Sequence, residues 1–159
     1  MSVDTKIQSL IPQMAEAMHR YAGIGLAAPQ IGRSQQIFLI ENSANPRRAI
    51  RQGTRNTQAF LNPVIEWRSK TKEVDEEGCL SLPGLFLPIK RPDAVRVRCL
   101  TGDGKPVILE AKGLAARVFQ HEIDHLQGKL IIDRIGPVQR LKIRKQLKEI
   151  KETGEVQSA

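Results

Sequence analysis

The sequence predicts a single α+β domain built mainly from antiparallel strands. Short apolar runs follow one another at hairpin distance in the middle of the chain, without long helical segments to space them. Amphipathic segments typical of helices lie near both ends. The length of 159 residues suits one compact domain with a substantial core. We expect that domain to occupy residues 1–152, followed by a disordered polar tail at 153–159.

The first part of the chain alternates between helix, loop and strand. Apolar residues recur at three- and four-residue spacing over 5–21, and Asp4 precedes them in the position of an N-cap, which predicts an amphipathic helix. A glycine-rich segment at 23–32 breaks this pattern and is predicted to be a loop. The apolar run at 37–40 then predicts a short buried strand.

The central part of the chain contains a basic segment and several strands. Residues 42–58 include arginines but no acidic residue, among Asn, Ser, Pro and Gly, and are predicted to form a mobile surface loop. A strand is predicted at about 60–73. Two more, at 94–100 and 107–111, are separated by a glycine-containing turn and therefore form a hairpin.

Two helices are predicted in the last part of the chain. Gly113 and Gly128 bound the first, at about 114–127. The second runs over about 137–152. It places four basic residues at helical spacing on one face: Arg140, Arg144, Lys148 and Lys151.

Composition excludes several classes of protein. The apolar fraction of 40% and the charged fraction of 26% are close to globular averages, and no run approaches the roughly 18 apolar residues of a membrane span. The start of the chain lacks the features of a signal peptide, and the two cysteines cannot form a disulfide framework. A cytoplasmic location is therefore expected. The net charge of +8 favours attraction to polyanions.

The strongest chemical signal is the segment His121-Glu122-Ile123-Asp124-His125 within a predicted helix. Side chains at positions i and i+4 lie on the same helical face, so the two imidazoles can bind one metal ion. Glu122 is rotated by about 100° from His121 and points beside the metal rather than at it. This is the position of a general base.

At least one further metal ligand must come from elsewhere in the chain. A metzincin would have a histidine at position 131, where this chain has Ile131. His19 lies on the first amphipathic helix and is expected to have a structural role. Cys99 alternates with outward-facing arginines on its strand and is expected in the core.

Cys79 is the remaining candidate, and it lies in a glycine-flanked turn after three acidic residues. These acids should raise the pKa of a free thiol and make it a poor nucleophile, whereas a bound cation would deprotonate it. We therefore predict that Cys79, His121 and His125 bind the metal and leave a fourth position open for water.

The glycine-rich loop lacks the spacing of a dinucleotide-binding motif and does not follow a strand, so no nucleotide cofactor is expected. Its glycines would let the backbone approach an extended ligand closely. Gln30 could direct an amide donor at a developing oxyanion. A plain connection between a helix and a strand is the alternative interpretation.

Three segments together closely resemble the motifs of the bacterial peptide deformylases, in order and in spacing: GIGLAAPQ at 23–30, EGCLS at 77–81 and QHEIDHLQG at 120–128. The resemblance extends from about the first helix to Arg134. It implies a metallohydrolase that removes the formyl group from the initiator methionine of nascent chains and releases formate. It also implies mainly antiparallel sheets packed around a central metal-binding helix, and iron(II), replaceable by zinc, nickel or cobalt, as the metal.

The resemblance also assigns roles to individual residues. Cys79, His121 and His125 match the metal ligands, and Glu122 matches the catalytic acid and base. Gln30 and the backbone N–H of Leu80 match the oxyanion donors. Ile24, Gly25 and Gly78 match backbone sites that pair with an extended peptide. Deformylases normally have a longer segment, including a strand, before the first helix, and most of that strand is missing here.

The substrate is expected to be an N-formyl-Met peptide, read mainly through its backbone. An apolar pocket for the methionine side chain could use Ile24, Leu114 and Val118, the last of which lies three residues before His121 on nearly the same helical face.

Two other functions stay open at this stage. A zinc endopeptidase would need a downstream glutamate ligand, and Glu149, surrounded by basic residues, is the central candidate. An RNA-binding module with a structural metal is favoured by the basic stripe of the last helix. The stripe is also compatible with a deformylase, which could use it to dock on ribosomal RNA. No membrane partner is expected.

Overall fold

The computed structural model describes residues 3–43 and 45–154. The elements in chain order are α1 (Thr5–Arg20), β1 (Gly25–Ala27), the 3-10 helix η1 (Ala28–Ile31), β2 (Ile37–Glu41), α2 (Pro46–Gln52), β3 (Thr57–Arg68), β4 (Lys72–Cys79), β5 (Leu82–Pro92), β6 (Ala94–Thr101), β7 (Pro106–Lys112), α3 (Gly113–Leu126), the 3-10 helix η2 (Ile131–Asp133), α4 (Pro137–Lys142) and α5 (Arg144–Thr153).

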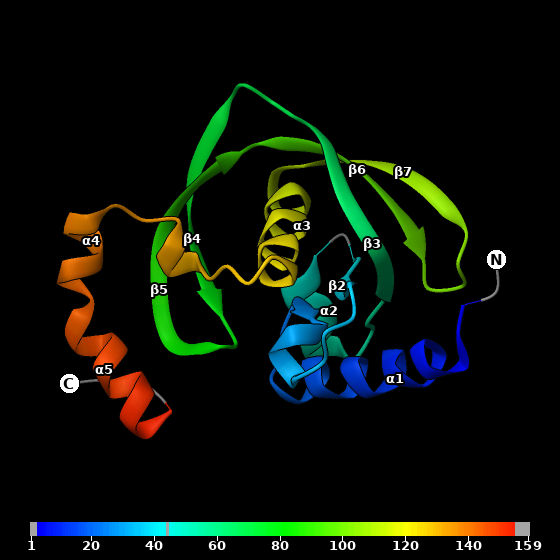
Figure 1. Ribbon diagram of the computed structural model, residues 1–159, viewed down its shortest axis with the longest axis horizontal. Coiled ribbons are helices and arrows are strands. Elements are labelled where there is room, and N and C mark those ends of the chain that lie inside the picture. Colours follow the sequence, from blue (N-terminus) through cyan, green and yellow to red (C-terminus); the bar gives the residue numbers. More distant parts are fainter. Residues whose placement is uncertain (1–2, 44, 155–159) are drawn as a thin grey trace.

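The strands form two antiparallel sheets. One has five strands in the order β1-β2-β3-β6-β7, and the other is the hairpin β4-β5. Figure 1 shows α3 near the centre, with β6 and β7 arching over it and the β4-β5 hairpin beside it. The predicted α+β class with mainly antiparallel sheets around a central helix is thereby confirmed.

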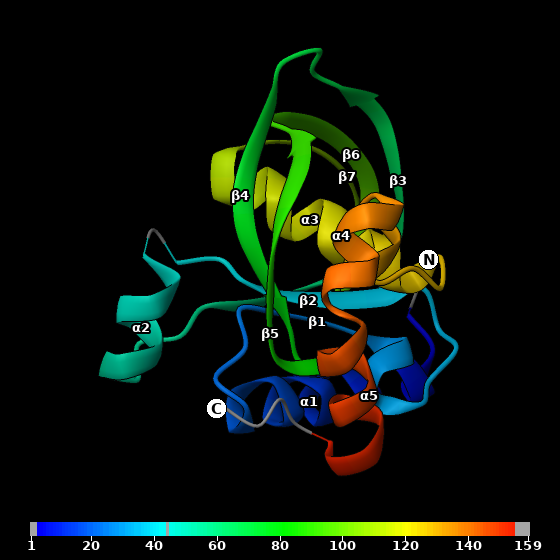
Figure 2. The same ribbon diagram turned by 90° about the vertical axis from the view of Figure 1, so that its left-hand side faces the viewer.

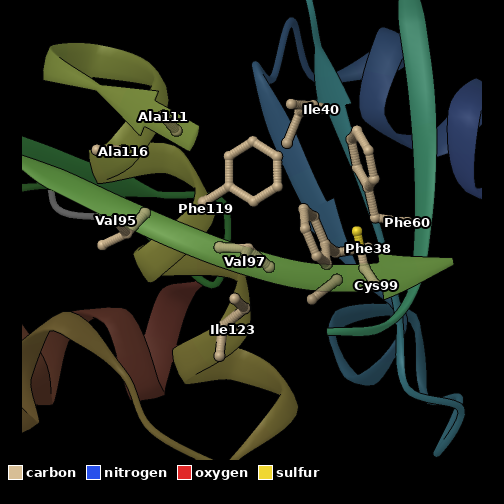
Figure 3. Packing of buried hydrophobic residues seen from close by; sticks show 11 residues of the cluster. Phe38, Ile40, Phe60, Val95, Val97, Cys99, Ala111, Ala116, Phe119 and Ile123 are labelled. Carbon is tan, nitrogen blue, oxygen red and sulfur yellow. The ribbon is translucent and has the colours of Figure 1, made fainter. Parts of the chain in front are cut away.

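An aromatic cluster fixes α3 to the large sheet. Phe119 of α3 packs against Phe38 of β2 and Phe60 of β3, with ring centroids 5.4 and 5.2 Å away (Figure 3). Val97 and Cys99 extend the cluster from the inward face of β6, and Cys99 is only 2% exposed, as expected for a core residue. Aromatic pairs of this kind contribute about 0.5–1.5 kcal/mol each beyond their buried area. The helix that carries the two histidines is therefore held rigidly.

Helix α1 follows the sequence prediction closely. Asp4 accepts a hydrogen bond from the backbone N–H of Lys6 at 3.1 Å and caps the helix, while Leu10, Met14 and Met18 are buried against β1 and β2. This packing supports the short strand β1, whose Gly25 and Leu26 line a cleft.

Two predictions for the basic parts of the chain are wrong. The segment predicted as a loop at 42–58 contains α2, which projects from the body of the molecule in Figure 2. Its Asn, Pro and Gly act as helix-boundary residues: Asn45 accepts from Arg48 N, Pro46 is the first helical residue, and Gly53 ends the helix. The last helix is also not continuous, because it breaks at Ile143.

The break at Ile143 has a packing reason. Ile143 is 7% exposed and belongs to a cluster with Ile131 and Leu85, so the change of direction places its side chain against the β4-β5 hairpin. Helix α5 then continues to Thr153, one residue into the predicted tail, and residues 155–159 of that tail lie outside the described residues. None of the described helices is both long and apolar enough to span a bilayer.

Candidate active site

The β4-β5 hairpin and α3 bring together the three predicted metal ligands. Cys79 is the last residue of β4, and His121 and His125 lie one helical turn apart on α3. His125 Nε2 is 3.2 Å from Cys79 Sγ and 3.1 Å from His121 Nε2. Among the described residues, these form the group able to hold a metal ion, with all ligand atoms within 4.8 Å of one another.

The hairpin turn determines where Cys79 points. Cys79 pairs with Leu82, so only Leu80 and Ser81 form the turn, and the register shifts between Gly78 and Cys79. Gly78 lies opposite Phe86, and a Cβ at Gly78 would come within 2.6 Å of the Phe86 ring. Glycine at position 78 therefore lets the exposed Phe86 ring lie against the backbone of β4.

The electrostatics of the three ligands favour a bound cation. Burial alone would raise the pKa of the Cys79 thiol, but hydrogen bonds to His121 and His125 lower it to about 5. Burial alone would lower the pKa of His121, but hydrogen bonds to Cys79 and Glu77 raise it to about 10. The surroundings thus stabilise positive charge between these side chains, whether a proton or a metal ion carries it. The donor set of one thiolate and two imidazoles fits a divalent transition metal.

The expectation that the preceding acidic residues raise the pKa of Cys79 is wrong. Glu77 is 6% exposed, and its carboxylate accepts hydrogen bonds from Arg91 Nε at 2.6 Å and Arg117 Nη1 at 2.7 Å. Its negative charge is therefore neutralised by two arginines, while two histidines face the thiol.

Glu77 also orients the first histidine ligand. Its Oε2 lies 3.0 Å from His121 Nδ1, and since a carboxylate only accepts, His121 donates from Nδ1 and leaves Nε2 for a cation. Burial would raise the pKa of Glu77, but hydrogen bonds from Arg91 and His121 lower it to about 2. Glu77 was part of the EGCLS motif, but this role was not predicted.

Arg91 has a second acidic partner, Asp124, which connects the charge network around Glu77 to the C-terminal part of α3. Asp124, beside His125 in sequence, accepts from Arg91 Nη1 at 2.8 Å and from Arg134 Nε at 2.9 Å. Arg91 of β5 thus joins α3 through Asp124 and β4 through Glu77, both of them buried. Neither Arg91 nor Arg117 was identified from the sequence, although Arg117 precedes His121 by one helical turn.

Glu122 occupies a different environment. It is 3% exposed, it lines the cleft, and its Oε2 has no hydrogen-bond partner within the part of the chain that the structure describes. Burial raises the pKa of Glu122 to about 7, against the opposing effect of His121 and His125. A carboxyl group with a pKa near neutrality can both accept and donate a proton.

Gln30 points its amide N–H group at the ligands. Its Oε1 accepts from the backbone N–H of Ala27 at 2.8 Å, which fixes the orientation of the amide. Its Nε2 donates to Ser81 Oγ at 3.1 Å and points at Cys79 Sγ at 3.7 Å. The side chain therefore presents a donor to the site. Ser81, which holds it, was not among the predicted site residues.

A cleft of about 1060 Å³ leads to these groups. The predicted substrate-binding residues all line it: Ile24, Gly25, Gly78, Leu114 and Val118. Leu80 lines it as well, at the hairpin turn. Strand β1 is at the edge of the five-stranded sheet, and the carbonyl of Ile24 already accepts from Glu41 N at 2.8 Å. Because hydrogen-bonded and non-hydrogen-bonded pairs alternate along an antiparallel ladder, the backbone N–H and C=O groups of Gly25 face the free edge of the sheet.

Two other candidate ligands do not join the site. His19 Nε2 is 2.8 Å from Thr57 Oγ1, consistent with the structural role expected for it. Glu149 lies on α5, pairs with Lys145 at 4.0 Å, and is not part of the metal-binding group. The arrangement required for a zinc endopeptidase with a glutamate ligand is therefore not found among the described residues.

Comparison with known proteins gives a consistent result. A family model described as "Polypeptide deformylase" matches residues 1–141. The peptide deformylase of Thermotoga maritima is 43% identical over 150 residues, which cover 94% of this chain and 85% of the relative. Peptide deformylase 1 of Burkholderia multivorans is 38% identical over 148 residues, covering 93% of this chain and 77% of the relative.

Solved structures agree with this match. A peptide deformylase from Legionella pneumophila superposes with a TM-score of 0.81 at 35% identity and covers 95% of this chain and 84% of its own. A peptide deformylase from Synechococcus elongatus in complex with actinonin has a TM-score of 0.81 at 36% identity, with coverage of 96% and 77%.

Proposed function

The chain belongs to the polypeptide deformylase family, and from this premise we propose how its residues divide the work of removing the N-formyl group from nascent polypeptides. It is a hydrolase that acts on formylated peptides. The observation that carries the proposal is the convergence of Cys79, His121 and His125 beside the buried, unpartnered carboxylate oxygen of Glu122.

Cys79, His121 and His125 hold one divalent metal ion in this proposal. Iron(II) is the native metal, and zinc, nickel or cobalt can replace it, because thiolate and imidazole ligands suit all of them. When bound, such an ion acts as a Lewis acid and lowers the pKa of water, so that water can give up a proton and act as a nucleophile at neutral pH. The protein's own contribution is to present three donor atoms at one point, and Glu77 supports it by fixing the His121 ring.

Glu122 moves the proton. Its Oε2 accepts a proton from the water whose oxygen attacks the formyl carbon, and the carbon–nitrogen bond then breaks. The protonated Glu122 returns that proton to the leaving amine, so that formate and a free amino group are produced. The raised pKa of Glu122, about 7, suits both halves of this exchange.

Gln30 and the backbone N–H of Leu80 stabilise the oxygen of the tetrahedral intermediate. The orientation of the Gln30 amide, set by Ala27 and Ser81, places its N–H group near Cys79. Leu80 begins the hairpin turn directly after Cys79. Fixed donors of this kind lower the barrier because they need no reorganisation when charge develops.

The substrate backbone pairs with the free edge at Gly25 and with Gly78, and the methionine side chain enters the apolar part of the cleft beside Ile24, Leu114 and Val118. We place this activity in the cytoplasm, where formylated nascent chains emerge. Docking on ribosomal RNA through the basic residues of α4 and α5 is the further part of the proposal.

The experiment that tests this proposal is a metal assay coupled to hydrolysis of formyl-Met-Ala-Ser under anaerobic conditions. The chain loaded with iron(II) should contain one metal ion and release formate, and removal of the metal should abolish the release. A loaded chain that releases no formate would contradict the proposed activity.

A further inference from the structure

Strand β1 contains a glycine, Gly25, at a position whose backbone conformation does not require glycine. Gly25 pairs with Ile40 in the antiparallel β1-β2 ladder, and its φ is not among the positive values found at other glycines of the described chain. A glycine inside a strand lowers stability relative to residues with a side chain, and it often marks a close approach of another group.

The group that approaches Gly25 is the side chain of Glu122. A Cβ placed on Gly25 would lie 2.8 Å from Cδ and 3.1 Å from Cγ of Glu122, and closer still to its Oε1. Carbon atoms that are not bonded to each other attract at about 3.5–4.0 Å and repel at shorter distances. The carboxylate of Glu122 therefore occupies the volume that any side chain at position 25 would need.

Glu122 has little freedom to move away. It is 3% exposed, and α3 is anchored on either side of it by Phe119 and Ile123 in the aromatic core. The neighbouring residue His121 is held by Glu77. A shift of the carboxylate would have to disturb a packed helix or move the buried Oε2 from its position.

We propose that Gly25 is a positioning residue for Glu122: the absence of a side chain at position 25 lets the carboxylate lie against strand β1 with Oε2 directed to the reacting atoms. The inference rests on the proposed function for the role of Glu122, but the steric contact itself does not. It adds a second role to Gly25 besides backbone pairing with the substrate.

Other glycines of the chain supply the contrast. A Cβ at Gly23 would meet Leu80 Cδ1 at 2.9 Å, and the carbonyl oxygen of Gly25 and Met18 Cγ at 3.3 Å each, so its nearest contact is the end of a flexible leucine side chain. A Cβ at Gly136 would meet nothing within 4 Å, and its φ of −73° suits alanine. Gly136→Ala is therefore a matched control for the change of glycine to alanine.

The test is a set of thermal unfolding measurements that do not depend on activity. Gly25→Ala is combined with wild-type Glu122, with Glu122→Gln, which keeps the shape, and with Glu122→Ala, which removes the obstructing atoms. We expect Gly25→Ala to lower Tm in the first two backgrounds and to leave it unchanged or raised in the third. Glu122→Asp, which is shorter by one methylene group, serves as a second relieved background should Glu122→Ala fold poorly. Gly136→Ala should leave Tm within error in every background.

Kinetics with formyl-Met-Ala-Ser then separate positioning from substrate pairing. A displaced Glu122 should lower kcat of Gly25→Ala by about tenfold or more, with little change in KM and with the metal content unchanged. An equal loss of Tm in all backgrounds, or an effect confined to KM, would overturn the proposal. If the wild-type chain releases no formate, the proposed function fails, while the Tm measurements still decide whether Gly25 and Glu122 are in steric contact.

Discussion

The two buried glutamates of the site show how the surroundings give one residue type two roles. Glu77 is surrounded by Arg91 and Arg117, and its pKa is lowered to about 2 against the effect of burial. Glu122 has no such partner for its Oε2 among the described residues, and burial raises its pKa to about 7. Glu77 therefore stays ionised and orients His121, whereas Glu122 can exchange a proton near neutral pH.

This assignment predicts that Glu122→Gln retains the metal and loses nearly all turnover. The amide has the shape of the carboxylate but cannot carry the proton, and positioned acid or base groups typically contribute about 10²–10⁴-fold. Formate release and metal content are measured on the same sample. A loss of less than tenfold would contradict the role given to Glu122.

The two cysteines should respond differently to substitution. Cys79→Ser should sharply weaken binding of iron(II) or zinc, because the variant loses a soft, negatively charged ligand that is 3.2 Å from His125 Nε2. Cys99→Ala is the control, since Cys99 lies in the core cluster with Phe38. Metal per chain is measured after dialysis against a weak chelator. Equal occupancy in wild type and Cys79→Ser would refute the ligand set.

Cys99 also predicts a pH dependence of stability. Burial raises its pKa from 9.0 to about 11, so the unfolded state releases the thiol proton at lower pH than the folded state does. The contribution of Cys99 is therefore complete below about pH 9 and is lost as the pH rises towards 11. Over this pH interval, the free energy of unfolding, measured with urea, should fall more steeply with pH in the wild type than in Cys99→Ala. Parallel curves would contradict the assigned cause.

At the scale of elements, strongly periodic patterns were predicted, whereas α2, β1 and η1 lie in segments that were predicted to be loops. The periodicity of α1, the i,i+4 histidines of α3 and the hairpin of β6 and β7 are all local. The strand predicted at about 60–73 is wrong in extent, because β3 ends at Arg68 and β4 begins at Lys72, and β5 was not predicted. Both strands of the β4-β5 hairpin are edge strands, so the prolines of β5 can lie at positions that need no donor.

The same distinction applies to the site. The ligands and Glu122 could be predicted because helical spacing and motifs identify them. The partners of Glu77 could not, because Arg117 is 40 residues away and only the packing of β4 and β5 against α3 brings them together. A buried charge network has no periodic pattern in the sequence.

The buried network predicts that two arginines on the consecutive strands β5 and β6 differ greatly in their contribution to the free energy of unfolding. Arg91→Met removes one arginine from each of two buried acids, Glu77 and Asp124, which keep Arg117 and Arg134, and should cost about 3 kcal/mol of unfolding free energy, the lower end of the range for breaking a buried ion pair. The control Arg96→Met breaks an exposed pair with Glu110, where the side chains are 47% and 64% exposed, and should cost about 0–1 kcal/mol. Urea unfolding measures both. Similar losses for the two variants would show that the buried network does not hold the hairpin to α3.

At the scale of the whole molecule, the site lies where two separately stabilised units meet. The aromatic core fixes α3 to the five-stranded sheet, and the β4-β5 hairpin has its own cluster with η2, Ile143 and α5. The metal ligands come from both units, since Cys79 belongs to the hairpin and the histidines to α3. A bound ion should therefore stabilise the fold by joining them. In Figures 1 and 2, α4 and α5 lie on the outer side of this hairpin.

The position of α4 and α5 leads to the last prediction, that their basic residues bind ribosomal RNA. Arg140, Arg144, Lys148 and Lys151 lie on these two helices in a chain with a net charge of +8. The break at Ile143 changes the geometry of this stripe, and part of its charge is paired, since Arg140 is 3.7 Å from Asp133 and Lys148 is 3.8 Å from Glu152. Both pairs are exposed and can open at small cost when phosphate is available.

Neutralising these four residues together should abolish salt-sensitive co-sedimentation with ribosomes and leave hydrolysis of formyl-Met-Ala-Ser intact, because none of them is a proposed catalytic or metal-binding residue. Phosphate contacts release counterions, so the log of the wild-type affinity should fall with the log of salt concentration by about 0.7–0.9 per contact. Neutralising the exposed Lys70, Lys72, Lys90 and Lys112 removes the same charge elsewhere and is the control. If binding survives the change in α4 and α5 with the same salt slope, or is lost equally in the control, net charge rather than this stripe attracts the RNA.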